Sequence, residues 1–194
     1  MAKNSVIWML FALMAISQLA IPALMIKGQE DTLSYGTEYR FRTRPVDPYD
    51  LMRGKYITLQ YDEVWAKSAS NWNSGDLVFI TLSEDEQGFA RLEEAFQDRP
   101  TSEIDYLEIT LDGYHFEERD SIYVRLPFDR FYMEESKAQA AEDLYRESAR
   151  SEEIDAYAVV MVKEGKAVLK NVMLDGVPIK EAVERMYLDN STEE

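Results

Sequence analysis

The sequence predicts a mainly β fold of the α+β class, in which an N-terminal transmembrane helix precedes a single antiparallel β-rich domain. Three observations lead to this prediction. Residues 4–26 contain no charged side chain, several later segments alternate apolar with polar residues, and residues 134–150 are rich in helix-forming residues. With 46% apolar and 12% aromatic residues, the chain is expected to fold around a substantial core.

The N-terminal stretch is long enough to cross a membrane. It lies between Lys3 and Lys27, and at about 1.5 Å per residue it spans a hydrocarbon core of roughly 30 Å. The alternative is a cleaved signal peptide, whose apolar region usually has only about 7–15 residues. We therefore predict a single-pass anchor at 1–27, with 6–26 in contact with lipid, and one domain at 28–194.

Charge and cysteine content exclude several classes of function. All 37 acidic residues but only 19 of the 21 basic residues follow Lys27, so the predicted domain has a formal charge of −18. This charge repels nucleic acid, and no nucleic-acid partner is predicted. The chain has no cysteine, which excludes a thiol nucleophile, an iron–sulfur site and a disulfide framework. The single histidine, His115, lacks the neighbouring ligands that a metal site requires, and no metal or cofactor is predicted.

The first predicted strand, at 36–44, has an arginine row on one face. Its aromatic residues, Tyr39 and Phe41, alternate with Arg40, Arg42 and Arg44. Such a row can form ordinary cross-strand pairs with Asp and Glu on a neighbouring strand. It can also bind an anionic ligand, because guanidinium groups hold carboxylates through two hydrogen bonds. Both interpretations are open.

A turn-forming corner follows and leads into a strand at 55–61. Asp47 precedes a proline and Gly54 closes the corner, with Asp50 and Arg53 between them. The two carboxylates can cap the turn, hold a cation or act in acid–base catalysis. Side chains of the strand alternate between two faces, with Tyr56, Thr58 and Gln60 on one and Ile57, Leu59 and Tyr61 on the other.

Residues 54–61, Gly-Lys-Tyr-Ile-Thr-Leu-Gln-Tyr, resemble the signature of the bacterial GDYXXLXY family, with Lys55 in place of the aspartate. The blocks at 131–134, 165–169 and 175–176 are also similar to that family. The resemblance implies a membrane-anchored, extracytoplasmic protein of unassigned biochemical function, often encoded near multi-spanning membrane proteins. It supplies no catalytic residue. The positive-inside rule favours the opposite orientation, because Lys27 and the three arginines after it indicate a cytoplasmic domain.

The rest of the chain predicts further strands and two helices. A polar connection is expected at 64–73, a long helix at 134–150, a short helix at 178–188 and frayed residues after it. The predicted strands are 77–82, 88–96, 104–111, 121–126, 154–163 and 166–172, the last two forming a hairpin.

Two functions from different classes remain. Phosphate-binding, zinc-protease and serine-hydrolase motifs are absent from the sequence. The leading hypothesis is therefore an extracytoplasmic, periplasmic interaction or accessory domain that works with another membrane protein. Its contact surface would be its helix or the corner formed by Asp47, Asp50, Arg53, Gly54, Tyr56, Leu59 and Tyr61. The alternative is a membrane-anchored hydrolase with Ser/Lys or Asp/Asp chemistry, in which Lys55 is the base. The sequence does not predict an oligomeric state.

Overall fold

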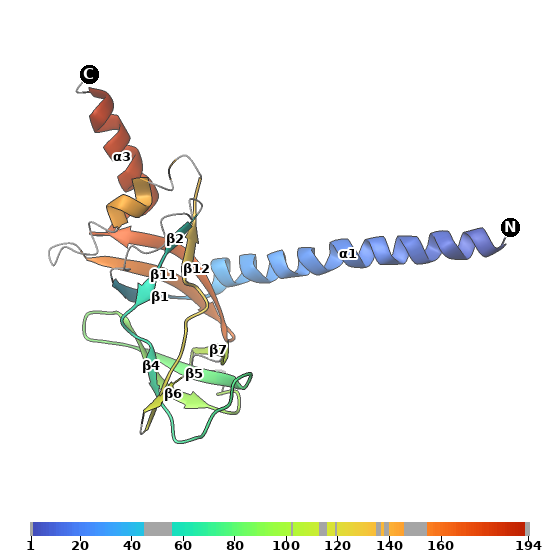
Figure 1. The fold of residues 1–194 in the computed structure, drawn as a ribbon, viewed down its shortest axis with the longest axis horizontal. Helices are drawn as coiled ribbons and strands as arrows, with labels where there is room; N and C mark the ends of the chain where they lie inside the picture. Colours follow the sequence, from blue (N-terminus) through green and yellow to red (C-terminus); the bar gives the residue numbers. More distant parts are fainter. Residues whose placement is uncertain are drawn as a thin grey trace.

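The computed structural model describes residues 2–44, 56–101, 103–112, 116–118, 120–134, 137, 140–145 and 155–192. Helix α1 (Ala2–Tyr35) projects from the β-rich part of the chain (Figure 1). Its segment Val6–Tyr35 is long and apolar enough to cross a membrane, and its most apolar part is not covered by the domain. The helix continues beyond the uncharged stretch, so it ends later than the predicted anchor.

Helix α1 leads into the first strand of a five-stranded antiparallel sheet. Its order is β13-β12-β11-β1-β3. Two-residue turns at Glu164–Gly165 and Asp175–Gly176 have positive φ at both positions, as tight hairpins require. The first turn confirms the hairpin predicted between 154–163 and 166–172. The strands are β1 (Thr37–Arg44), β3 (Gln60–Tyr61), β11 (Ala156–Lys163), β12 (Lys166–Leu174) and β13 (Val177–Pro178).

A six-stranded sheet forms the second half of the domain, in the order β7-β5-β6-β4-β9-β8. It is mixed, because β4 and β6 pair in parallel at Lys67 and Glu94. Strand β5 is apolar along most of its length and lies between β6 and β7. The strands are β4 (Trp65–Lys67), β5 (Leu77–Glu84), β6 (Ala90–Phe96), β7 (Tyr106–Thr110), β8 (Phe116–Glu118) and β9 (Ser121–Tyr123).

One core joins the two sheets. Its buried side chains include Phe41 and Val160 from the first sheet and Ile80 and Leu107 from the second. A short ladder of β2 (Tyr56–Thr58) and β10 (Arg130–Tyr132) adds Ile57 and Phe131. Helix α3 (Ile179–Thr192) and the helical residues 140–145 complete the described fold.

The predicted fold class is confirmed, with several local corrections. The connection at 64–73 contains β4, because Ala66 is buried between neighbouring strands. The strand predicted at 121–126 ends at Tyr123, and β10 was not predicted. Helix α3 continues to Thr192, so the prediction that the chain frays after residue 188 is wrong. Within 134–150, only the helical residues 140–145 and isolated neighbours lie in the described ranges.

Candidate functional site

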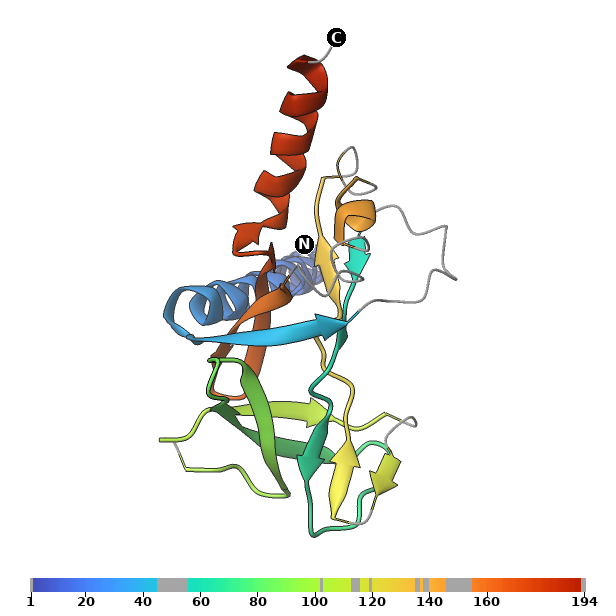
Figure 2. The ribbon, with the colours of Figure 1, turned by 90° about the vertical axis from the view of Figure 1, so that its left-hand side faces the viewer.

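Two segments that are distant in the sequence run side by side from one sheet to the other (Figure 2). We call residues 56–67 and 121–132 the connecting ribbon. Tyr56 lies opposite Tyr132 at one end, and Lys67 lies opposite Ser121 at the other. The two residue numbers of each pair have the same sum at both ends, so the ribbon keeps one antiparallel register without an inserted residue.

The two segments separate in the middle of the connecting ribbon. On one side of the opening, the Leu59 N–H donates to the Asp129 carbonyl at 2.9 Å. On the other side, the Val124 N–H donates to the Val64 carbonyl at 2.9 Å. Between these bonds, β3 leaves its partner and pairs with β1. The opening therefore lies where one strand passes between the sheets.

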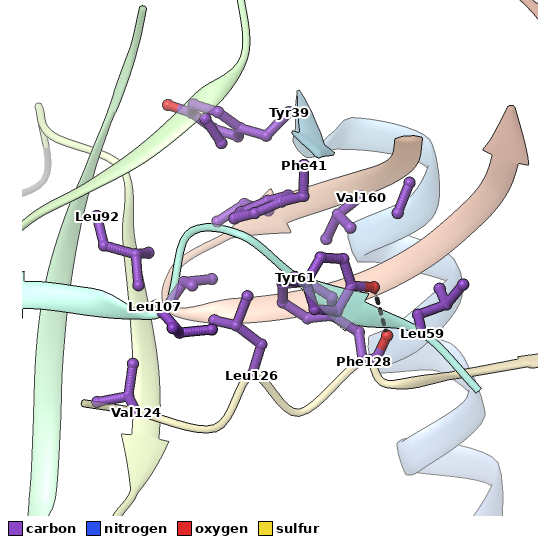
Figure 3. Close-up of a cluster of buried hydrophobic side chains, with 14 of the residues drawn as sticks. Tyr39, Phe41, Leu59, Tyr61, Leu92, Leu107, Val124, Leu126, Phe128 and Val160 are labelled. Carbon is purple, nitrogen blue, oxygen red and sulfur yellow. Dashed lines mark hydrogen bonds between the residues drawn. The ribbon is translucent and has the colours of Figure 1, made fainter. Parts of the chain in front are cut away.

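Aromatic side chains fill this opening (Figure 3). The rings of Tyr61 and Phe128 are 5.2 Å apart and nearly perpendicular, and Phe41 contacts both from β1. All three side chains are at most 5% exposed. Edge-to-face packing of this kind adds to the free energy gained from burial. We call Phe41, Tyr61 and Phe128 the aromatic seam.

Tyr61 is also held by its hydroxyl group. The hydroxyl donates to the Phe128 carbonyl at 2.8 Å, which satisfies a polar group within the apolar seam (Figure 3). Burial raises the pKa of Tyr61 above its ordinary value, and interactions with Tyr145 and Asp129 raise it further. The phenol therefore stays neutral at physiological pH, and its hydroxyl remains a hydrogen-bond donor to Phe128.

The signature residues contact one segment of the chain. Leu59 is bonded through its backbone to Asp129, and Tyr61 contacts Phe128. Tyr56 stacks against Tyr132 with ring centres 5.5 Å apart. Residues 56–61 and the 131–134 block, both quoted for the family resemblance, are thus direct neighbours. Their shared role is to fix the connecting ribbon.

The turn of the β11–β12 hairpin forms a second joint between the sheets. The Glu108 N–H on β7 donates to the Gly165 carbonyl at 2.8 Å. Gly165 has φ +85°, and a Cβ there would lie 2.7 Å from the Tyr106 ring and 2.9 Å from Glu108 Cβ. Only glycine combines this backbone conformation with so close an approach. The block at 165–169 therefore also begins at a joint.

The arginine row forms a third joint. Arg40 donates to the carbonyls of Gly88 at 3.1 Å and Gln87 at 3.2 Å, in the turn between β5 and β6. Arg42 donates to the Gln87 side chain, and its guanidinium lies 3.7 Å from the centre of the Phe89 ring. These contacts join the two sheets through hydrogen bonds and cation–π packing.

Neither sequence interpretation of the row describes these contacts. On β11, the residues opposite Arg40 and Arg42 are Val159 and Tyr157 rather than acids. Among the described residues, the carboxylate within ion-pair distance of Arg42 is that of Asp155, at 3.7 Å and just before β11. Arg44, at the end of the row, is exposed. An anionic ligand at this row stays a prediction.

The corner lies outside the described residues. Asp47, Asp50, Arg53 and Gly54 belong to it, so its acid–base, cation-binding and turn-capping interpretations stay predictions. Lys55 and His115 also lie outside the described residues. Within the described ranges, no group of three or more His, Cys, Asp or Glu side chains is arranged to hold a metal ion.

Helix α1 joins the domain without an intervening linker. Its last turn is closed by the Gly36 N–H, which donates to the Thr32 carbonyl at 2.9 Å, and β1 begins at the next residue. Thr32 is only 2% exposed. Lys163 on β11 pairs with Asp31 at 2.5 Å and lies over the Tyr35 ring. Asp31 raises the pKa of Lys163, which favours its charged form.

A groove of 800 Å³ lies between α1 and the tip of the β11–β12 hairpin. The helix contributes apolar side chains of its uncharged stretch, including Leu24 and Met25, which are 69% and 65% exposed. The opposite rim carries Glu164 and Lys166. The groove is therefore apolar toward the free end of α1 and charged toward the domain.

Several of these contacts were not predicted. Phe128 lies outside every predicted strand and helix, and no periodicity marked it as a partner of Tyr61. Arg40 was expected to meet a neighbouring strand, but it reaches a turn in the other sheet. The groove combines residues more than 130 positions apart, which no local pattern could bring together.

One comparison with known proteins gives a match. A family model with the description GDYXXLXY protein matches residues 18–172. The matched range includes the second half of α1, the connecting ribbon and all three joints between the sheets. No curated protein and no solved structure matches the chain.

Proposed function

Since the chain belongs to the GDYXXLXY family, we propose that it is a membrane-anchored accessory domain that binds another membrane protein. The family is of unassigned function, and α1 is a candidate membrane span. The proposal further places the domain outside the cytoplasm, in the periplasm, as the family resemblance implies. Its acidic surface, with a formal charge of −18 after Lys27, would keep the domain soluble there.

The direct joint between α1 and β1 is the observation that carries this proposal. A domain on a flexible linker samples many heights and orientations above a membrane. Here the buried Thr32, the tight Gly36 and the Asp31–Lys163 pair restrict those motions. A partner in the same membrane would therefore meet a preorganised surface, which lowers the entropy lost on binding.

The aromatic seam offers no general base. Burial raises the pKa of its one titratable group, the Tyr61 phenol, and burial also raises the pKa of the nearby Tyr39 and Tyr145 to about 12. Groups that stay neutral across the physiological range do not serve as general bases there. The hydrolase alternative rests on Asp47, Asp50 and Lys55, and no contact in the described residues favours it.

The experiment is an affinity purification of the tagged full-length chain from gently solubilised membranes, quantified by mass spectrometry. We expect one membrane protein to be recovered in a fixed ratio. A flexible Gly/Ser linker inserted between Tyr35 and Gly36 should reduce that ratio, because it removes the fixed orientation. The same linker after Asp98, in an exposed loop, is the matched control and should retain the partner.

The corner is tested in the same purification with the double variant Asp50→Ala/Arg53→Ala. Loss of the partner from this folded variant would identify the corner as a contact surface. If the unmodified chain recovers no membrane protein in a fixed ratio, the accessory-domain proposal fails. The purified domain would then be assayed for hydrolase activity.

A further inference from the structure

Helix α1 exposes a polar side chain within its apolar stretch. Gln18 is exposed, and within the described part of the chain its amide has no hydrogen-bond partner. The neighbouring Ser17 differs, because its hydroxyl donates to the Met14 carbonyl at 2.8 Å. An amide surrounded by hydrocarbon costs free energy unless it is bonded. Among the described side chains of this stretch, Gln18 is therefore the one that needs an external partner.

A second polar group at the same residue is affected by Pro22. In a helix, the carbonyl of residue 18 accepts from the N–H of residue 22, and proline has no N–H. Gln18 thus presents an amide donor, an amide acceptor and a backbone carbonyl that has lost its usual donor. Transmembrane helices commonly satisfy such groups through side chains of a neighbouring helix.

The position of Gln18 around α1 shows which side that neighbour would occupy. Gln18, Met25 and Thr32 are seven residues apart, close to two helical turns, so they lie on one face. Thr32 is buried against the domain, and Met25 lines the groove. Gln18 consequently lies on the line that leads along α1 into the groove.

This geometry disfavours a second copy of the chain as the neighbour. In a symmetric parallel pair, the Gln18 faces of both helices would turn toward each other. Because the domain lies on that same face of α1, both domains would be directed into one volume above the helices. The favoured occupant is a helix that ends at the membrane surface and carries no domain there.

We propose that the Gln18 face of α1 and the groove above it receive a transmembrane helix of another membrane protein, which bonds to Gln18 through a polar side chain. This inference rests on the proposed membrane-anchored function. The bonding side chain would lie about 14 Å below the level of Lys27, nine residues at about 1.5 Å each. The polar end of the helix would meet Glu164 and Lys166 on the groove rim.

The test measures energy transfer in phospholipid vesicles between the full-length chain and synthetic leucine-rich transmembrane peptides. One peptide has a single Gln at the depth of Gln18, and its control is all leucine. Because the chain has no cysteine, Gln97→Cys on the domain surface gives one labelling site. We expect the Gln peptide to bind roughly threefold to tenfold more tightly than the all-leucine peptide.

The matched variants are Gln18→Leu and Ser17→Ala. Gln18→Leu should abolish the preference for the Gln peptide, whereas Ser17→Ala should retain it. Equal binding of both peptides to the unmodified chain, or an unchanged preference with Gln18→Leu, would overturn the assignment. Self-association of the chain that depends on Gln18 would also overturn it.

The two proposals can fail separately. Neither variant alters the domain, so the thermal unfolding of both should match that of the unmodified chain. If affinity purification recovers the same partner in the same ratio from Gln18→Leu, the accessory function stands and the Gln18 contact is wrong. If the unmodified chain recovers no partner, the function itself is wrong whatever the peptides do.

Discussion

The aromatic seam and the apolar stretch of α1 both contain polar groups among apolar side chains, but the two regions differ in how those groups are hydrogen-bonded. In the seam, the Tyr61 hydroxyl donates a hydrogen bond to the Phe128 carbonyl at 2.8 Å. Beside it, the Leu59 N–H donates to the Asp129 carbonyl at 2.9 Å. Among the described residues, no buried side-chain polar atom lacks a partner. On α1, the exposed Gln18 amide has no hydrogen-bond partner among the described residues.

This difference separates a structural role from a binding role. Satisfied groups in a low-dielectric interior stabilise one arrangement and have little capacity left for a ligand. An unsatisfied group gains free energy when a partner arrives. The signature residues Tyr56, Leu59 and Tyr61 therefore explain how the sheets are joined. The contact surface that we propose lies outside the signature, on α1.

The largest expected effect is that of Tyr61→Ala. Removing this ring leaves a cavity beside Phe41 and Phe128 and leaves the Phe128 carbonyl without its donor. We expect the free energy of unfolding to fall by about 3–5 kcal/mol, as for other large-to-small core substitutions. Urea denaturation of the full-length chain in detergent, followed by circular dichroism, measures the change.

Tyr132→Ala is the control for that substitution. Its ring also contacts a signature residue, Tyr56, but it is 63% exposed. We expect a loss below about 1 kcal/mol, the usual range for an exposed aromatic pair. Similar losses from both substitutions would show that the seam is not the principal joint between the sheets.

Gly165→Ala should have the next largest effect. The added Cβ would meet the Tyr106 ring at 2.7 Å, and φ is +85°. Gly176→Ala is a matched control, because it has φ +75° in the other tight hairpin but nothing within 4 Å of a Cβ. Backbone strain of about 1 kcal/mol is common to both substitutions. Any larger loss of unfolding free energy in Gly165→Ala than in Gly176→Ala measures the contact between the sheets. Equal losses would show that Gly165 does not help to join the sheets.

The sequence predicted much of the domain because local alternation survives in the structure. Ile57, Leu59 and Tyr61 were assigned to one face of a strand, and all three are buried. The hairpin at Glu164–Gly165 was predicted from its turn residues, and β5 from its apolar run. These features depend on residues close together in the sequence, so they can be predicted from local patterns.

The joints between the sheets could not be predicted in the same way. The 55–61 segment was expected to be one strand, but it divides because β2 pairs with β10 and β3 pairs with β1. Arg40 contacts a turn 47 and 48 positions away. The alternation of residues in its strand predicted only the face on which Arg40 lies. No pattern in the sequence distinguishes Gln18 from the rest of the uncharged stretch. Its proposed contact depends on its alignment with Thr32, and the two residues share one helix face because α1 continues to Tyr35.

The smallest expected effect is that of Tyr61→Phe, which removes one hydroxyl and keeps the ring. At neutral pH, we expect a loss of about 0.5–1.5 kcal/mol from the hydrogen bond to Phe128. Tyr187→Phe, on the exposed part of α3, should leave the free energy of unfolding unchanged. Urea denaturation of the three chains at neutral pH measures both values.

Alkaline pH then tests whether the seam hydroxyl is buried as strongly as its geometry requires. The folded pKa values of Tyr39 and Tyr145 are raised from 10.0 to about 12, and that of Tyr61 is raised as well. Unfolded tyrosines lose protons first, so the contribution of these groups is complete below pH 10 and is lost as the pH rises toward 12. Tyr61→Phe removes one such group, and its free energy of unfolding should fall less steeply above pH 10 than that of the unmodified chain. Tyr187→Phe provides the reference slope, and equal slopes for the two variants would mean that the Tyr61 hydroxyl reaches solvent and that the seam is open.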